Sequence, residues 1–266
     1  MRKALAAGIP ALLAAASFGA AVFFGARIYD TCRQDMESEA AYEEMAQHVR
    51  PGSRTGTEDM PGPDDMPMEG AEGIPEEKER ILDIDFAALK EEVPDLAGWL
   101  YCPDTEISYP VVQGQDNSYY LDHLPDGSGN RNGSLFMDCG NREGFADENT
   151  LVYGHHMARG TMFACLVSYA DQAYYEAHPV IYFITEETDY RLELFSGYTA
   201  AVASEAYTLR FSTEGEFAGW LERAQRRSDF VPKVQAGAAD HVVTLSTCAY
   251  SFQDARYVVH GRLTEN

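Results

Sequence analysis

The sequence has few basic residues. Only 20 of its 266 residues are Lys or Arg, against 43 that are Asp or Glu, and the formal net charge is −23. Binding to a nucleic-acid backbone requires concentrated positive charge. The composition therefore excludes nucleic acid as a partner.

The sequence also lacks the residue spacings that bind metal ions. Its five Cys residues include no C-x-x-C pair, and its acidic residues show no spacing typical of a Ca²⁺ loop. We therefore expect no metal and no cofactor. In an exported chain, an odd number of cysteines leaves at least one thiol free unless the protein dimerises through it.

Long hydrophobic runs are absent apart from residues 4–26, which carry no charge and follow Arg2 and Lys3. At about 1.5 Å per residue, this helix would span the roughly 30 Å hydrocarbon layer of a membrane. Basic residues before the run and acidic residues after it place the N-terminus inside the cell. We expect residues 1–29 to be a cytoplasmic start and a transmembrane signal-anchor of a single-pass cell-membrane protein; cleavage as a signal peptide remains an alternative.

Residues 30–75 are acidic and, in their second half, rich in proline. Residues 30–95 contain 20 acidic and 6 basic residues, and five prolines lie in 51–75. Such a composition cannot bury enough apolar area to offset the entropy of ordering, so we expect an extracytoplasmic linker over 30–75, although residues 30–50 have helix-forming composition.

Residues 76–266 form the predicted folded domain, and their pattern indicates a mainly β fold with added helices. Helical spacing of apolar residues predicts helices over 76–92, 162–177 and 217–227. Many short strands with few helices are typical of a mixed-topology β-barrel. The expected strands are 97–101, 107–112, 134–137, 150–155, 180–185, 190–198, 242–247 and 256–263.

The last two strands place a thiol beside a guanidinium. Val243 and Leu245 share one strand face, whereas Ser246 and Cys248 lie on the other. If the apolar faces point into the barrel, Cys248 and Arg256 both lie outside it, at strand ends joined by a short loop. Such a pair can supply a stabilised thiolate and a partner for an oxyanion.

A histidine on another strand completes a set for acyl transfer. Alternation places Tyr153 and His155 on one face and His156 on the opposite face. A thiolate would attack a carbonyl, a protonated imidazole would protonate the leaving amine, and a guanidinium would stabilise the negative charge. His260, on the face of Arg256, is a weaker candidate.

The motifs around these residues resemble those of the class B sortases. The segment Thr244-Leu245-Ser246-Thr247-Cys248, followed eight residues later by Arg256, resembles the sortase T-L-x-T-C…R signature. Residues 149–157 (NTLVYGHHM) resemble the segment of the catalytic histidine. Residues 98–100, 107–114 and 119–121 are similar to the N-terminal strands of that class. The resemblance covers residues 76–266, which it implies to be a sortase catalytic domain. Because the linker contributes no catalytic group, we expect a soluble fragment that starts near Pro75 to retain activity.

The resemblance implies an eight-stranded sortase-type β-barrel with an N-terminal helical segment and a helix before the cysteine strand. Sortases are membrane-anchored cysteine transpeptidases of Gram-positive bacteria. The resemblance implies that Cys248 cleaves a C-terminal sorting motif after its Thr and forms a thioester. His155 would act as general acid and then base, and Arg256 would hold the substrate or the oxyanion.

The implied partners are exported proteins with a sorting motif and an amine of the peptidoglycan precursor. The resemblance also implies substrate-binding positions at Ser246, Tyr153, Ser108 and Thr247. Three alternatives remain open: a pilus-assembling sortase that uses a pilin lysine, a secreted cysteine endopeptidase, and a non-catalytic anchored binding module. The residues that flank Cys248 lack the C-G-S-C-W pattern of papain-like enzymes.

Overall fold

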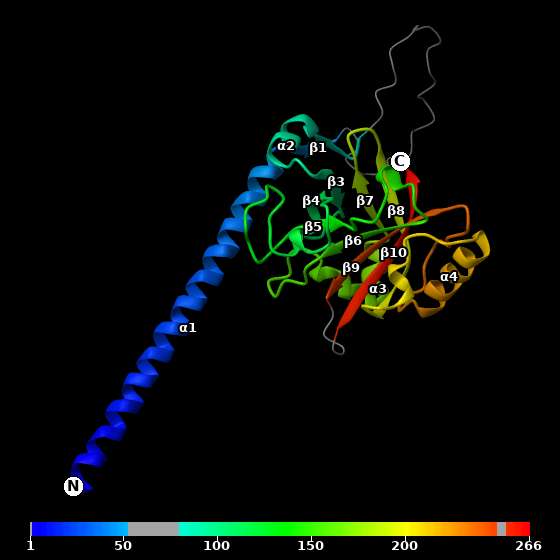
Figure 1. The fold of residues 1–266 in the computed structure, drawn as a ribbon. Helices are drawn as coiled ribbons and strands as arrows, with labels where there is room; N and C mark the ends of the chain where they lie inside the picture. The colour runs from blue at the N-terminus through cyan, green and yellow to red at the C-terminus, as the bar shows by residue number, and fades with distance from the viewer. Residues whose placement is uncertain (1, 53–79, 249–253) are drawn as a thin grey trace, which may run out of the picture.

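Eight strands close into a barrel (Figure 1). The structure is a computed structural model that describes residues 2–52, 80–248 and 254–266, and it does not describe the side chains of residues 2–16 and Cys248. The strand order around the barrel is β10-β8-β7-β3-β4-β5-β6-β9. The predicted eight-stranded β-barrel is therefore confirmed. Its strands are β3 (Leu96–Tyr101), β4 (Ser108–Val112), β5 (Leu135–Met137), β6 (Asn149–Gly154), β7 (Val180–Ile184), β8 (Asp189–Ala201), β9 (His241–Cys248) and β10 (Ala255–Glu265).

The barrel mixes parallel and antiparallel pairs. Strands β4 and β5 are parallel, as are β6 and β9, and the other neighbouring pairs are antiparallel. Because β6 and β9 run in the same direction, their C-terminal ends lie at the same edge of the barrel. Strand β10 begins at that edge, since it runs antiparallel to β9.

The two faces of β9 and β10 belong to different cores. Val243, Leu245 and Val259 are fully buried in the barrel interior, so these apolar faces point inward. On the outer face, Val242 and Val258 pack in a second core with α4 (Glu214–Arg227). Helix α4 therefore covers part of the outer wall and precedes the strand of Cys248.

All three predicted helices have different bounds in the structure, and that of 217–227 begins three residues earlier, as α4. The segment 162–177 forms the 3₁₀ helix η3 (Ala164–Ala170) and then α3 (Gln172–Ala177), because Asp171 accepts a hydrogen bond from Ala173 N and starts a new helix. The segment 76–92 contains β2 (Leu82–Ile84) and α2 (Phe86–Glu92). Residues 76–79 lie outside the described part of the chain.

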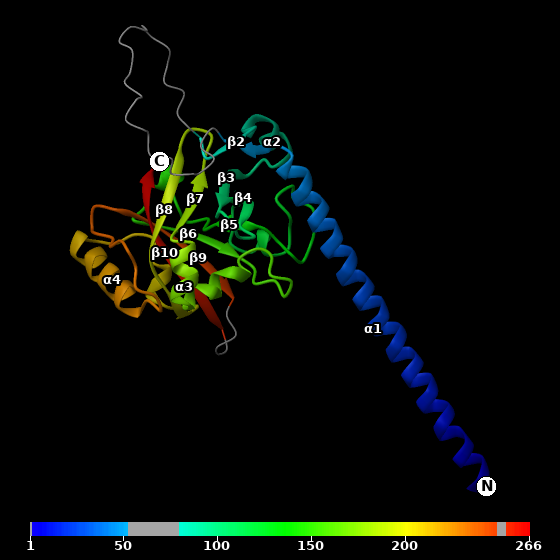
Figure 2. The same cartoon turned by 180° about the vertical axis from the view of Figure 1, so that it is seen from behind.

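The N-terminal helix α1 (Arg2–Ala46) continues well into the predicted linker (Figures 1 and 2). It projects from the barrel at its N-terminal end and meets it at its C-terminal end. Residues 30–46 are thus helical, and β1 (Val49–Pro51) pairs with β2. The helix persists because Arg33 forms ion pairs with Asp30 and Glu37, one turn away on either side, and because Met45 is buried against the barrel. Residues 53–79 of the predicted linker lie outside the described residues.

The described part of α1 exposes several large apolar side chains, among them Phe18, Phe23 and Phe24. Within the portion of the chain whose side chains are described, no helix is both long enough and apolar enough to cross a membrane. The predicted signal-anchor, residues 4–26, falls partly outside that portion, which excludes the side chains of residues 2–16.

Candidate active site

The strand register brings three segments together at one edge of the barrel. Cys248 on β9 lies directly opposite Arg256 on β10. Gly154, the last residue of β6, pairs with Thr247, so His155 follows at the level of Cys248. Neighbouring strands are about 4.8 Å apart. The backbone therefore brings the predicted thiol, imidazole and guanidinium positions to three adjacent strand ends.

The imidazole of His155 is held by a backbone carbonyl. His155 is half-buried, and its Nε2 lies 2.7 Å from the carbonyl oxygen of Leu121. A carbonyl can only accept a hydrogen bond, so Nε2 carries the proton. Proton exchange with a substrate then falls to Nδ1.

Gly154 is required immediately before the histidine. A Cβ at this position would overlap Leu135 Cδ2 and would lie 2.7 Å from Phe163 Cδ2. The backbone of His155 is fixed on its other side, because Phe163 N donates to the His155 carbonyl at 3.0 Å. Only glycine therefore allows the end of β6 to pack this closely under the loop that carries His155.

Arg256 is half-buried at the start of β10, and its Nη1 donates to the carbonyl of Ala255 at 3.1 Å. It shares the outer face with Val258, which packs under α4. The guanidinium therefore belongs to the outer wall of the barrel. The position of the Cys248 backbone is described, but its side chain is not.

Beside these strand ends, a wall of aromatic and polar side chains continues along the outer face. Ser246, two residues before Cys248, has its Oγ 3.0 Å from the hydroxyl of Tyr207. The rings of Tyr207 and Tyr153 stack at 6.3 Å with an angle of 9° between their planes. The Tyr153 hydroxyl donates to Asp138 Oδ2 at 2.7 Å. Burial, together with this carboxylate, raises the pKa of Tyr153, so it remains a neutral donor.

Sequence reasoning placed Ser246 and Tyr153 in this wall but missed two of its members. Tyr207 ends the three-residue 3₁₀ helix η4 (Glu205–Tyr207), and Asp138 lies just after β5, so neither segment is long enough to show a periodicity that indicates a face. For Asp138 one signal was available, because it is a polar residue that directly follows the buried strand β5, next to β6.

Two other predicted substrate-binding residues are placed elsewhere. Ser108 lies on β4, two strands from β6, and its Oγ accepts a hydrogen bond from Trp99 Nε1 at 3.1 Å. Thr247 is 1% exposed and alternates with Ser246, so its side chain points toward the barrel interior. His260 is fully buried under α4, which explains why its position on the face of Arg256 does not bring it to the surface.

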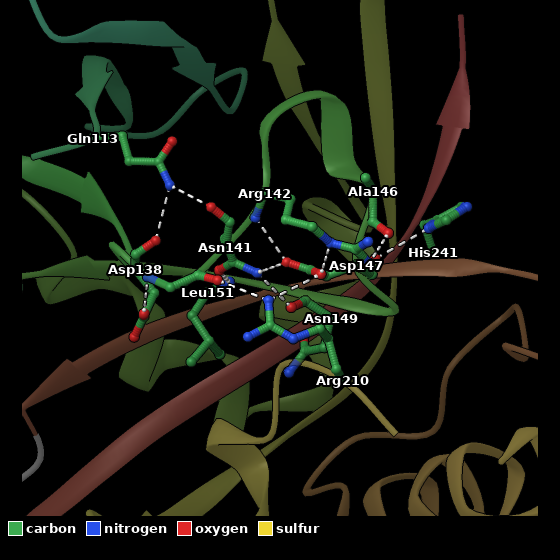
Figure 3. Close-up of polar contacts among 11 residues, drawn as sticks. Gln113, Asp138, Asn141, Arg142, Ala146, Asp147, Asn149, Leu151, Arg210 and His241 are labelled. Atoms are coloured by element: carbon green, nitrogen blue, oxygen red, sulfur yellow. Dashed lines mark hydrogen bonds and ion pairs between the residues drawn. The ribbon is translucent and has the colours of Figure 1, made fainter. Parts of the chain in front are cut away.

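A buried polar network fixes the other end of β6 (Figure 3). Asp147, which is 0% exposed, accepts hydrogen bonds from Arg142 Nε at 2.6 Å, Asn141 Nδ2 at 3.0 Å and Arg210 Nη1 at 3.3 Å. Burial by itself would raise the pKa of Asp147, but these donors outweigh it and hold that pKa below its ordinary value. The loop before β6 is therefore tightly held, and β6 is a rigid support for His155.

The described residues include no group of three or more His, Cys, Asp or Glu side chains that could hold a metal ion. The chemistry available at the strand ends is that of a thiol, an imidazole and a guanidinium. Together with the neighbouring Tyr–Ser wall, these groups suit acyl transfer from a peptide bound along the outer face.

Comparison with known proteins identifies the family. A model of the sortase domain matches residues 100–264. Sortase B of Listeria monocytogenes is 36% identical over 171 residues, which cover 64% of this chain and 70% of that protein. Sortase B of Staphylococcus aureus is 29% identical over 255 residues, 91% of each chain. A solved sortase B–substrate complex from S. aureus superimposes with a TM-score of 0.65 at 33% identity, covering 68% of this chain and 84% of that one. The chain therefore belongs to the sortase family, within its class B members, which are cysteine transpeptidases.

Proposed function

We propose that this transpeptidase cleaves exported proteins after the Thr of a C-terminal sorting motif and joins them to an amine of the peptidoglycan precursor. The observation that carries the proposal is the register at the ends of β6, β9 and β10. It aligns the backbone positions of Cys248 and Arg256 directly, and His155 follows at the same level.

In the first half of the reaction, the Cys248 thiolate attacks the carbonyl carbon of the motif's Thr, and a C–S bond forms. Arg256 stabilises the negative charge on the carbonyl oxygen or holds the substrate. His155 gives a proton from Nδ1 to the departing nitrogen as the C–N bond breaks, while Nε2–H stays on the Leu121 carbonyl. The products are a thioester on Cys248 and a free amine on the released peptide.

In the second half, an incoming primary amine attacks the thioester carbonyl. His155 accepts the amine's proton on Nδ1, the C–S bond breaks, and Cys248 leaves as a thiolate. Water in place of the amine would give hydrolysis. A groove that favours the amine is therefore what separates this activity from that of a cysteine endopeptidase.

The substrate would bind along the outer wall. Ser246 and Tyr153 contribute to it, and the stacked ring of Tyr207 gives an apolar surface with hydroxyl groups at its edge. Ser108 and Thr247, which the resemblance also implied, lie outside this wall. We further propose that residues 4–26 anchor the enzyme in the cell membrane, with the barrel outside the cytoplasm, because basic residues precede this apolar run and acidic residues follow it.

Substitution of the nucleophile tests the proposal directly. Incubation with a peptide library, followed by mass analysis, should select one sorting motif and detect its acyl thioester on Cys248. Cys248→Ala should lower cleavage by several powers of ten, because no thiolate remains to attack. Cys139→Ala, which removes an exposed thiol, is the matched control and should behave as wild type. Cleavage retained by Cys248→Ala would remove this residue as the nucleophile.

Trapping the acceptor separates the related activities. Products formed with an amine of the peptidoglycan precursor support wall anchoring, whereas products formed with a pilin lysine support pilus assembly. Release of acid alone in the presence of either amine would support an endopeptidase.

A further inference from the structure

The C-terminal half of α1 rests on the two loops that hold His155. One loop, residues 113–134, supplies the Leu121 carbonyl that binds His155 Nε2. The other, residues 155–163, carries His155 itself. Hydrogen bonds and ion pairs join α1 to both loops, so this helix can influence where the imidazole lies.

The first connection runs through Tyr42. Its hydroxyl donates to the carbonyl of Gly133 at 2.8 Å. Gly133 has a left-handed φ of 58°, and a Cβ there would lie 2.6 Å from the Leu121 carbonyl oxygen. Because these two backbone segments are in direct contact, a shift of Gly133 displaces the carbonyl that binds His155.

The second connection uses the ring of the same tyrosine. Tyr42 packs edge-on against Tyr109, with ring centroids 5.3 Å apart and an angle of 82°. The Tyr109 hydroxyl accepts a hydrogen bond from Met162 N at 3.3 Å. Met162 forms a β-bridge with His156, so this contact supports the loop directly after His155.

A carboxylate on α1 joins the two loops to each other. Asp35 Oδ1 accepts from Arg131 Nη2 at 3.3 Å and from Asn132 Nδ2 at 3.2 Å, both in the loop of Leu121. Asp35 Oδ2 lies 3.5 Å from Arg159 Nε, in the loop of His155. The carboxylate is 11% exposed, so solvent screens these interactions less than it would on an open surface.

We propose that Tyr42 is a positioning residue for His155, and that α1 acts through Tyr42 and Asp35 to set the imidazole against the ends of β9 and β10. The inference rests on the proposed function, in which His155 moves protons. In this proposal α1, the helix that leads to the predicted anchor, also determines the position of a side chain in the active site.

The test uses Tyr42→Phe in the full chain in detergent micelles. This variant keeps the ring against Tyr109 and removes only the hydrogen bond to Gly133. With a peptide selected from the library, kcat should fall about 10- to 100-fold while KM stays unchanged, because the groove is intact and the proton donor is displaced. Tyr29→Phe is the matched control: Tyr29 is on the same helix, is 71% exposed, and should retain wild-type kcat.

A second readout does not depend on activity. In a ¹⁵N-histidine spectrum, the Nε2–H proton of His155 should exchange with water faster in Tyr42→Phe than in wild type, and at the wild-type rate in Tyr29→Phe. An unchanged kcat or an unchanged imidazole signal in Tyr42→Phe overturns the proposal. If wild type cleaves no library peptide, or Cys248→Ala cleaves as wild type does, the proposed function fails instead, and the spectrum still decides whether Tyr42 holds His155.

Discussion

His155 and His260 have different roles because their environments differ. His155 is half-buried, and a backbone carbonyl binds its Nε2. His260 is 0% exposed, its Nδ1 lies 2.8 Å from Thr244 Oγ1, and its Nε2 has no partner among the described residues. Burial lowers the pKa of His260 to about 3. His260 is therefore neutral in the folded protein and serves the packing under α4.

His260 makes stability depend on pH. Its pKa is about 6.5 in an unfolded chain and about 3 in the fold, so between these values the unfolded state binds more protons. The contribution of His260 is complete above pH 6.5 and declines as the pH falls toward 3. At pH 5 the loss is about 2 kcal/mol.

Urea unfolding at pH 7 and pH 5 tests this expectation. His260→Asn keeps an N–H group near Thr244 and cannot titrate, so its free energy of unfolding should fall less between the two pH values than that of wild type. The acidic residues are common to both proteins, and their effects cancel in the comparison. Equal losses in both proteins would show that His260 is not the responsible group.

Among the elements, the strands and the helical character of α1 were predictable, but the docking of α1 on the barrel was not. Alternation with a period of two assigned the faces of β6, β9 and β10, and in β9 it indicated from sequence alone which face carries Cys248. The docking of α1 depends on single contacts with irregular loops, such as Tyr42 with Gly133, and no pattern in an acidic segment indicates them. Tyr207 and Asp138 were missed for a similar reason, because a three-residue 3₁₀ helix and a loop residue show no period that assigns a face.

The end of β6 should not tolerate a side chain at Gly154. In Gly154→Ala the new Cβ would overlap Leu135 and the ring of Phe163, both of which are buried. We expect the free energy of unfolding to fall by about 1–3 kcal/mol, and cleavage to slow because His155 is the next residue. Denaturant unfolding and peptide cleavage measure the two effects. Gly129→Ala, with nothing within 4 Å of the new Cβ, is the control; equal behaviour of both variants would contradict the packing argument.

In the whole molecule, α1 links the predicted membrane segment to the barrel over a short distance. The apolar run ends at Ala26, and Gln34 is already hydrogen-bonded to the barrel domain, because its carbonyl accepts from Asn130 Nδ2 at 2.8 Å. Eight helical residues span about 12 Å. A barrel held this close to the proposed membrane surface, by a helix that also contacts the loops of His155, would have a defined height and orientation.

Two soluble fragments separate anchoring from positioning. The fragment from Asp30 lacks the apolar run but keeps the part of α1 that contacts the barrel. After membranes are washed with alkaline carbonate, this fragment should be found in the supernatant, and its rate of peptide cleavage should lie within about twofold of the wild-type rate. The fragment from Pro75 lacks α1 altogether. Sequence alone predicts that it remains active, but the contacts of Tyr42 and Asp35 reverse that expectation, and its kcat should be at least about tenfold lower.

Circular dichroism shows whether the shorter fragment keeps the barrel, and binding of the uncleaved peptide to Cys248→Ala versions of both fragments shows whether the groove persists. If both fragments are folded, bind peptide equally and cleave at the same rate, α1 serves only as a tether. If the shorter one binds normally and cleaves slowly, the deficit lies in proton transfer. In that case α1 has two separable roles. The apolar run anchors the protein in the membrane, and residues 34–46 hold the imidazole at the strand ends even in a fragment that no longer associates with membrane.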